Sequence, residues 1–321
     1  MTPPAQSGVR PYALPRGGRI GVVSLASTAE PMAFLQGCAS LAALTGWKIE
    51  NAVTEPVGDF AGTAEARAAS LMNLWQRPDV DAIICMRGGY GSNYVLPLLD
   101  FTAMRASAKP FIGHSDNTSI LLALDRAGIV CFHGPMLATD FHNGRADLIS
   151  LFAALSGQPL GFALAAGPNV RSLVEGEAHG TITGGCISIV VASLGTPWEV
   201  ETDGKILFLE DVNERPYRID RMLMQLKLAG KFNGVRGFIF GAMLNCTAAE
   251  REEPLPELIS RILGPLGVPI VFGVPSGHVE RGNLTLPFGV QSRLISCGRE
   301  VSLVAEAATV ARDLRTADEV R

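Results

Sequence analysis

Hydrophobic positions change their spacing repeatedly along the first half of the chain. Short apolar runs, typical of buried strands, alternate with segments in which apolar residues recur every three or four positions, typical of helices. The expected strands are residues 19–24, 48–50, 82–86, 111–112 and 128–132, and the expected helices cover 32–44, 62–77, the stretch through Val95 and Leu99, the segment from Ser119, and 146–155. This alternation predicts a mostly parallel sheet flanked by helices.

A similar pattern restarts after a turn-rich interval. Residues 156–159 and 166–169 are rich in residues that favour turns, so we predict a linker over 161–180. It separates an N-terminal α/β domain, residues 1–160, from a smaller C-terminal α/β domain, residues 181–321. The elements expected in the second half are helices over 183–194, 216–228 and 254–263, strands over 205–209, 237–240, 270–272, 283–287, 293–296 and 301–304, and a charged tail over 310–321.

Composition narrows the class of protein. The 321 residues are 47% hydrophobic and 18% charged, which suffices for two cores. A net charge of −4, a pI of about 5.8 and the absence of basic runs argue against nucleic acid as a partner. No apolar run is long enough for a membrane span, and the N-terminus lacks an apolar signal segment. Six scattered cysteines without a C-x-x-C pair indicate free thiols in a reducing cytoplasm, and neither a zinc site nor disulfides are expected.

A strand-to-helix turn at Ser115 is the first candidate for chemistry. An apolar run ends at Gly113, Ser115 follows two residues later, and helical spacing begins at Ser119. A nucleophile elbow has this geometry, because its sharp turn lifts the serine hydroxyl out of the sheet. The match to G-x-S-x-G is partial, since Asn117 stands in place of the second glycine. An ordinary turn with Ser115 or Asp116 as the helix N-cap explains the stretch equally well.

A serine nucleophile needs a base, and the base works best when a third group orients it. His278 follows an apolar strand in a loop rich in Pro and Gly, and it is the candidate base. A loop histidine is nevertheless more often a surface residue. The other histidines are adjacent to the serine, after a strand, or in polar loops: His114, His133, His142 and His179.

Glu210 is the candidate orienting acid. Four apolar residues lead directly into it, and Glu210 is the last residue of the strand expected there. A carboxylate on a buried backbone needs a partner. A structural ion pair with Arg215 or Arg218 is the alternative interpretation.

The glycine-rich stretch from Arg87 to Gly91 follows another expected strand. Its consecutive glycines, Gly88 and Gly89, free backbone N–H groups to point at an anion, which fits an oxyanion hole completed by the amide of Asp116. A phosphate loop is the rival interpretation, but neither G-x-x-x-x-G-K-[ST] nor a full G-x-G-x-x-G occurs. A tight turn is the simplest interpretation of all. Sites in parallel sheets form beyond the carboxyl ends of strands, so this stretch and the Ser115 turn could be neighbours.

Together these stretches resemble the bacterial LD-carboxypeptidase family of serine peptidases. The resemblance extends from residue 18 to about residue 289, and its segments are 87–91, 113–116, 133–136, 184–185, 195–197, 207–211, 214–221, 277–278 and 283–287. Each segment alone is weak evidence for the resemblance, whereas the order and spacing of all the segments together are specific to the family. Two departures are His114, where the family usually has an aromatic residue, and the sequence Val279-Glu280-Arg281 after the histidine.

The resemblance implies a Ser-Glu-His triad that is divided between the two domains. Ser115 would be the nucleophile, His278 the general base and acid, and Glu210 the orienting carboxylate. The implied oxyanion hole consists of the backbone amides of Gly88, Gly89 and Asp116. Candidates for binding the substrate's terminal carboxylate, by position only, are Arg87, Arg215 and Arg281.

The implied reaction removes the terminal D-alanine from the L-centre of a diamino acid in murein tetrapeptides or their sugar-linked forms. The resemblance places it in cytoplasmic peptidoglycan recycling, by a homodimer without metal or cofactor. One alternative is the related branch that confers microcin immunity by cleaving peptidyl-nucleotide or aminoacyl-nucleotide antibiotics. Another is a non-catalytic protein that binds muropeptides.

Overall fold

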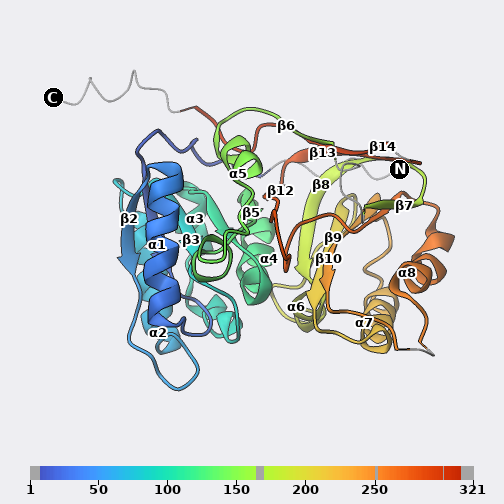
Figure 1. The fold of residues 1–321 in the computed structure, drawn as a ribbon, viewed down its shortest axis with the longest axis horizontal. Coiled ribbons are helices and arrows are strands. Elements are labelled where there is room, and N and C mark those ends of the chain that lie inside the picture. The colour runs from blue at the N-terminus through green and yellow to red at the C-terminus, as the bar shows by residue number, and fades with distance from the viewer. Residues whose placement is uncertain (1–7, 164–169, 250–251, 299, 312–321) are drawn as a thin grey trace.

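The computed structural model describes residues 8–163, 170–249, 252–298 and 300–311, and it contains two sheets that lie side by side (Figure 1). The first sheet has six strands, in the order β12-β5-β4-β3-β1-β2. Its strands are β1 (Arg19–Val23), β2 (Lys48–Ala52), β3 (Ala82–Cys85), β4 (Phe111–Gly113), β5 (Cys131–His133) and β12 (Leu286–Phe288). Neighbouring strands are parallel except β12, which pairs antiparallel with β5.

The second sheet has eight strands, in the order β6-β14-β13-β8-β9-β10-β11-β7. They are β6 (Leu160–Ala163), β7 (Arg171–Val174), β8 (Gly176–Cys186), β9 (Ile206–Val212), β10 (Gly237–Leu244), β11 (Ile270–Phe272), β13 (Gln291–Cys297) and β14 (Glu300–Ala305). The stretch β8-β9-β10-β11 is parallel, and antiparallel strands flank it. The two sheets confirm the predicted α/β class with a mostly parallel N-terminal sheet.

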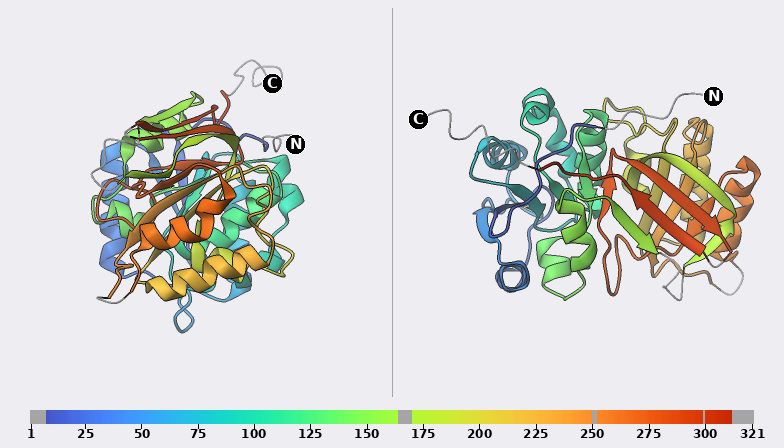
Figure 2. Two further views of the ribbon diagram at one scale, coloured as in Figure 1. Left: turned by 90° about the vertical axis from the view of Figure 1, so that its right-hand side faces the viewer. Right: turned by 90° about the horizontal axis from the view of Figure 1, so that it is seen from above.

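Helices cover both sheets. They are α1 (Pro31–Thr45), α2 (Ala64–Gln76), α3 (Phe101–Ala106), α4 (Thr118–Arg126), α5 (Leu148–Leu155), α6 (Ile187–Ala192), α7 (Pro216–Leu228) and α8 (Leu255–Leu263). Side-chain oxygens of Thr63, Asp100 and Asp147 accept from the first turns of α2, α3 and α5, which fixes where these helices begin. In the left view of Figure 2, α7 and α8 lie together on one face of the larger sheet.

Two helix predictions were wrong. The segment 183–194 is helical only over α6, because β8 continues to Cys186. Gly184 and Gly185 have φ angles of 126° and 132°, which a helix does not allow. The stretch through Val95 and Leu99 forms two short turns of 3-10 helix, Ser92–Tyr94 and Leu96–Leu98. Pro97 lacks the N–H that a longer helix would need.

Strand β9 also differs from its predicted extent. It continues to Val212, so Glu210 lies within the strand, paired with Cys186 of β8, and is not its last residue. The described residues of the expected linker lie mostly in β6, β7 and β8, and β12 of the second half joins the first sheet. The domain boundaries therefore stay a prediction. The turn expected at 166–169 and most of the 310–321 tail lie outside the described residues.

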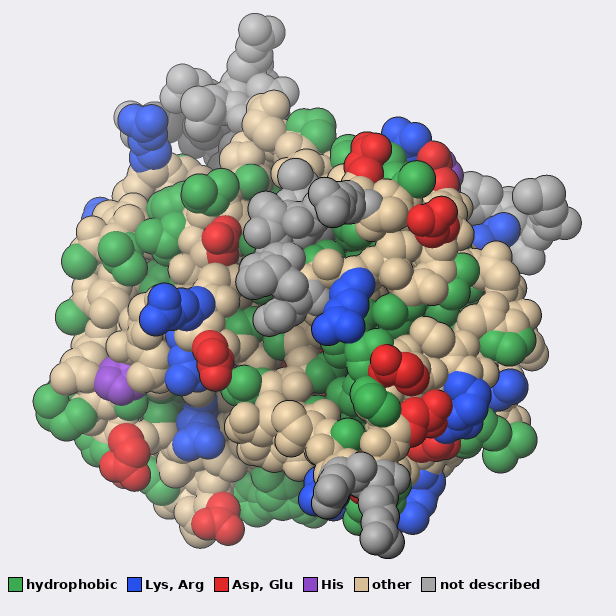
Figure 3. Space-filling model, turned by 45° about the vertical axis from the view of Figure 1, so that its right-hand side comes forward, with side chains coloured by type: hydrophobic (Ala, Val, Ile, Leu, Met, Phe, Trp, Pro, Cys, Tyr) green, Lys and Arg blue, Asp and Glu red, His purple; other side chains and the backbone are tan. Residues whose placement is uncertain are grey.

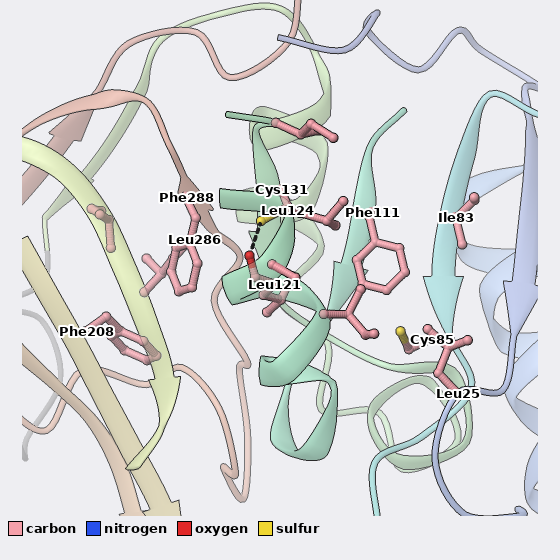
Figure 4. Packing of buried hydrophobic residues seen from close by; sticks show 14 of the residues in the cluster. Leu25, Ile83, Cys85, Phe111, Leu121, Leu124, Cys131, Phe208, Leu286 and Phe288 are labelled. Carbon is pink, nitrogen blue, oxygen red and sulfur yellow. Dashed lines mark hydrogen bonds between the residues drawn. The ribbon is translucent and has the colours of Figure 1, made fainter. Parts of the chain in front are cut away.

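One hydrophobic core joins the two halves. Figure 4 shows buried side chains that extend from Phe111 of β4, through Leu121 and Leu124 of α4, to Phe208 of β9 and Phe288 of β12. All five are fully buried. Burial of apolar surface between the sheets stabilises their relative position, on which any site shared between them depends.

The surface is mixed in charge. On the face drawn in Figure 3, acidic and basic side chains are interspersed. Within the described part of the chain, no helix combines the length and the apolar character needed to cross a membrane.

Candidate active site

Ser115 lies in a strained turn at the carboxyl end of β4. The strand ends at Gly113, a 3-10 turn covers Ser115–Asn117, and α4 begins at Thr118. The backbone of Ser115 has a φ of 61°, a left-handed conformation that non-glycine residues seldom adopt. Such strain is stored at functional sites, and the turn has the form of a nucleophile elbow.

Asn117 stabilises this turn from within. Its side-chain amide donates to the backbone oxygen of Arg87 at 3.0 Å and to that of His114 at 3.3 Å. The asparagine that replaces the second glycine of the elbow motif therefore joins the Ser115 turn to the loop after β3.

That loop brings Gly88 against the serine. A Cβ atom on Gly88 would lie 2.6 Å from the Ser115 Oγ and 3.4 Å from the Asp116 nitrogen, so only glycine fits. Gly89 has a φ of 114° and contacts Ser27 instead. The backbones of Gly88 and Asp116 thus lie beside the hydroxyl, as an oxyanion hole requires.

His278 connects the two halves of the molecule. Its Nε2 lies 3.0 Å from the Ser115 Oγ, and its Nδ1 lies 2.8 Å from Oε2 of Glu210. The backbone N–H of His278 donates to the same carboxylate oxygen at 3.1 Å. Gly277, with a φ of 98°, makes room for this contact, since a Cβ atom added at this position would lie 2.6 Å from the Cγ of Glu210. The three residues form one hydrogen-bonded line.

The protonation equilibria of this line are linked. Burial opposes ionisation of Glu210, but the charge of His278 and its hydrogen bond outweigh this effect, and the pKa of Glu210 is well below its usual range. Burial also opposes protonation of His278, yet the charge and hydrogen bond of Glu210 raise the pKa of His278. The arrangement can accept a proton from Ser115 and hold it as an imidazolium.

His114 does not reach the serine hydroxyl with a hydrogen bond. Its buried ring lies edge-on to that of His278, with centroids 5.2 Å apart, and its Nδ1 lies 3.0 Å from the Gly134 oxygen. Burial is the largest cause of the lowered pKa of His114. The ring therefore packs against the imidazole of His278 as a mainly neutral group.

The three candidate arginines occupy different places. Arg281 lines a cavity of about 690 Å³ together with His278. Arg215 pairs with Glu252 at 2.8 Å on the surface, and Arg87 donates to the Thr28 oxygen. Arg171, at the start of β7, also lines the cavity. The sequence offered no signal for Arg171, because it lies far along the chain from every motif.

A second cavity, of about 290 Å³, lies on the Asp116 side of the turn. Tyr90 and Trp198 line it, one from each half of the chain. Its lining includes one acidic side chain, Asp116, whereas Arg171, Glu280 and Arg281 line the cavity beside His278.

A hydrogen-bonded serine, histidine and carboxylate at the junction of an α/β fold define a serine-type hydrolase. The chain belongs to the LD-carboxypeptidase family, since residues 20–134 match the model of its N-terminal domain and residues 179–294 that of its C-terminal domain. Family and enzyme class are thus confirmed.

Similar proteins agree with this membership. A putative carboxypeptidase of Streptomyces coelicolor is 41% identical over 89% of this chain and 93% of the relative. A probable murein peptide carboxypeptidase of Bacillus subtilis is 33% identical over 96% of this chain and 97% of the relative. The crystal structure of a muramoyltetrapeptide carboxypeptidase from Oxalobacter formigenes matches with a TM-score of 0.81 at 28% identity, covering 92% of this chain and 100% of that one.

The chain is also similar to a protein with another named role. A microcin self-immunity protein of Escherichia coli is 27% identical over 81% of this chain and 85% of the relative.

Proposed function

We propose that the protein is a serine carboxypeptidase that releases the terminal D-alanine of murein tetrapeptides during cytoplasmic peptidoglycan recycling. The observation that carries the proposal is the hydrogen-bonded line from Ser115 through His278 to Glu210. Nε2 of His278 lies 3.0 Å from Oγ of Ser115, and its Nδ1 lies 2.8 Å from Oε2 of Glu210. The similarity to a probable murein peptide carboxypeptidase of Bacillus subtilis and a muramoyltetrapeptide carboxypeptidase of Oxalobacter formigenes supports the choice of substrate.

In the proposed mechanism, Nε2 of His278 takes the proton of Ser115 while Oγ attacks the carbonyl carbon that precedes D-alanine. The negative charge moves to the carbonyl oxygen, where the amides of Gly88 and Asp116 can stabilise it. Of the two glycines in the loop, Gly88 is favoured because its backbone lies beside Ser115 and the Asp116 nitrogen.

The tetrahedral intermediate then breaks down. His278 returns the proton to the amine of D-alanine, which leaves, and the peptide stays attached to Ser115 as an ester. Water, deprotonated by His278, attacks this ester and restores the free serine. Throughout, Glu210 accepts a hydrogen bond from Nδ1 of His278. This bond keeps Nε2 of His278 directed at the serine.

A carboxypeptidase must also bind a free carboxylate. Arg281 is the favoured candidate, because it lines the cavity beside His278, whereas Arg215 is engaged with Glu252. We expect Arg281→Gln to raise KM about tenfold or more, corresponding to a lost charged hydrogen bond. Arg215→Gln is the matched control. An unchanged KM in Arg281→Gln would exclude this residue.

The proposed function is tested by incubating the protein with murein tetrapeptide and measuring D-alanine. Release by the wild type and its loss in Ser115→Ala are expected. Turnover that survives in Ser115→Ala would refute the acyl-enzyme mechanism, and a wild type that releases no D-alanine would refute the substrate.

Hydrolysis of nucleotide antibiotics is the second candidate, favoured by the relative from Escherichia coli. The same serine would cleave a different acyl substrate. Comparing kcat/KM for murein tetrapeptide and for an aminoacyl-sulfamoyl adenylate separates the two functions. A wild type that binds muropeptide but turns over neither compound would instead be a binding protein.

A further inference from the structure

Arg67 is a buried charged side chain that has no part in the mechanism above. It lies on α2, and only 2% of its surface is exposed. Its guanidinium lies over the Phe60 ring, 5.1 Å from the centroid. Its Nη1 donates to the backbone oxygens of Leu25 and Gly91, the latter at 2.9 Å. A buried charge is costly unless hydrogen bonds and an opposite charge compensate it.

Asp116 provides the opposite charge through one peptide group. The backbone N–H of Ser92 donates to Oδ2 of Asp116 at 2.7 Å. The Gly91 oxygen and the Ser92 nitrogen belong to the same peptide bond, which we call the bridged peptide. Its oxygen faces the guanidinium of Arg67 and its N–H faces the carboxylate of Asp116. Hydrogen bonds arranged in such a chain polarise and strengthen each other.

Ser92 also binds the backbone of Asp116. Its hydroxyl donates to the Asp116 backbone oxygen at 2.5 Å, and Ser92 is fully buried. Burial raises the pKa of the Asp116 carboxyl, whereas the N–H of Ser92 and the charge of Arg67 oppose that rise. The residue whose amide is one proposed oxyanion donor is thus held by both its carboxylate and its carbonyl oxygen.

The other proposed donor lies in the loop that ends at the bridged peptide. The loop is attached to the Ser115 turn at its first residue too, where the Arg87 oxygen accepts from Asn117 at 3.0 Å. Gly88 lies between these two attachments. A Cβ atom added there would lie 2.6 Å from the Ser115 Oγ, so a small shift of the loop changes how its backbone meets the hydroxyl.

We propose that Arg67 is a positioning residue for the oxyanion hole and acts through the bridged peptide. Its cation holds the end of the loop that carries Gly88, and it supports the carboxylate of Asp116, whose amide is the second donor. The inference rests on the proposed function, because an oxyanion hole is needed only if Ser115 attacks a carbonyl. Misplacing such a group by about 1 Å can lower the rate about 10²-fold.

The kinetic test removes the cation. In Arg67→Met we expect kcat for D-alanine release to fall about 10- to 100-fold and KM to change less than about threefold, because the donors act on the transition state. Arg67→Lys keeps the charge and should recover part of the loss. Thr63→Ala is the control, since it removes the cap that accepts from Ala66 at the start of α2 and leaves the bridged peptide intact. A kcat in Arg67→Met equal to that of Thr63→Ala would refute the proposal.

The route from Arg67 to Asp116 has its own test. Ser92→Ala removes the hydroxyl that binds the Asp116 backbone oxygen but keeps the N–H. If both residues act through Asp116, the double variant with Arg67→Met should lose about as much kcat as the poorer single variant. Losses that multiply would show that Arg67 acts elsewhere. Arg67→Lys replaces Arg67→Met in this comparison if the methionine variant does not fold.

The positions of the donors can be measured without turnover. In the intact 15N-labelled protein, the amide signals of Gly88, Ser92 and Asp116 should shift in both Arg67 variants and stay in place in Thr63→Ala. Unmoved signals in the Arg67 variants would overturn the proposal. Shifted signals in a protein whose wild type releases no D-alanine would support the positioning role and overturn only the proposed function.

Discussion

Around Ser115, the close approach of neighbouring backbone limits which side chains can be introduced next to the hydroxyl. Gly88 is the nearest example, because its Cα faces the hydroxyl directly. Its φ is not left-handed, so an added Cβ is excluded by its clash with Ser115 and not by backbone strain. The added methyl group would enter the space of the nucleophile and of the oxyanion.

We therefore expect Gly88→Ala to displace the Ser115 side chain and to lose activity. A loss in kcat of about 10²-fold or more is expected, comparable to removal of an oxyanion-hole donor. Gly264→Ala is the matched control, since a Cβ there meets no atom within 4 Å. D-alanine release and the thermal midpoint should be measured for both variants. A fully active Gly88→Ala would mean that the reacting carbonyl lies elsewhere.

The raised pKa of His278 predicts opposite pH trends for activity and stability. The base must be neutral, so kcat/KM should rise with a midpoint above the ordinary histidine value. A group whose pKa is raised on folding stabilises the protein below its unfolded pKa and loses this contribution as pH rises through the folded pKa. Stability should consequently fall over the interval in which activity rises. Urea unfolding of Ser115→Ala and wild-type kinetics test this, and an acid limb below the ordinary value would contradict it.

At the same scale, the sequence selected the three side chains that lie in one hydrogen-bonded line, but not the groups that surround them. Ser115, Glu210 and His278 follow apolar runs of the sequence at motif positions, so pattern and resemblance select them. His133 ended a strand in the same way and offered no sign that it would face Glu210. Its contacts depend on how β5 and β9 meet, which periodicity within one element cannot specify.

Among the elements, β8 is one of those that periodicity misassigned. Residues 183–194 are apolar and contain small residues, which fits a buried helix as well as a buried strand. The distinction lies in Gly184, whose backbone approaches that of Phe208 so closely that a Cβ would clash with its oxygen. Only the neighbouring strand reveals this requirement.

Gly184→Ala should accordingly destabilise the protein. The φ of 126° and the contact with Phe208 both oppose a side chain, and we expect the free energy of unfolding to fall by about 2–4 kcal/mol. Gly161→Ala, in β6, has no neighbour within 4 Å of the new Cβ and no left-handed φ, so it should change little. Urea midpoints measure both, and equal midpoints would show that β8 can move away from β9.

At the scale of the whole molecule, the proposed mechanism requires that the two halves stay docked, because Ser115 and His278 come from different halves. Besides the apolar core, a buried ion pair joins them. Lys205, beside β9, lies 2.7 Å from Asp125 of α4, with side-chain exposures of 10% and 6%. Thr183 of β8 donates to the same carboxylate at 2.7 Å. The homodimer implied by the family resemblance stays a prediction, which light scattering would test.

Removing one member of this pair should impair docking and catalysis together. Lys205→Met leaves Asp125 charged, buried and without its cation, which costs about 3–5 kcal/mol. We expect a lower thermal midpoint and, near that midpoint, a steep loss of D-alanine release. Asp125→Asn combined with Lys205→Met removes the stranded charge, keeps an acceptor for Thr183, and should recover most of the stability.

Arg126, the residue after Asp125 in α4, provides the control for this test. Arg126 also reaches the second half, at 2.6 Å from Glu201, but its side chain and that of Glu201 are 42% and 52% exposed. A solvated pair contributes at most about 1 kcal/mol, so Arg126→Met should leave stability and activity nearly unchanged. If Lys205→Met were as mild as Arg126→Met, the apolar core alone would hold the halves together. If the double variant recovered stability but not activity, the ion pair would set the angle at which His278 meets Ser115.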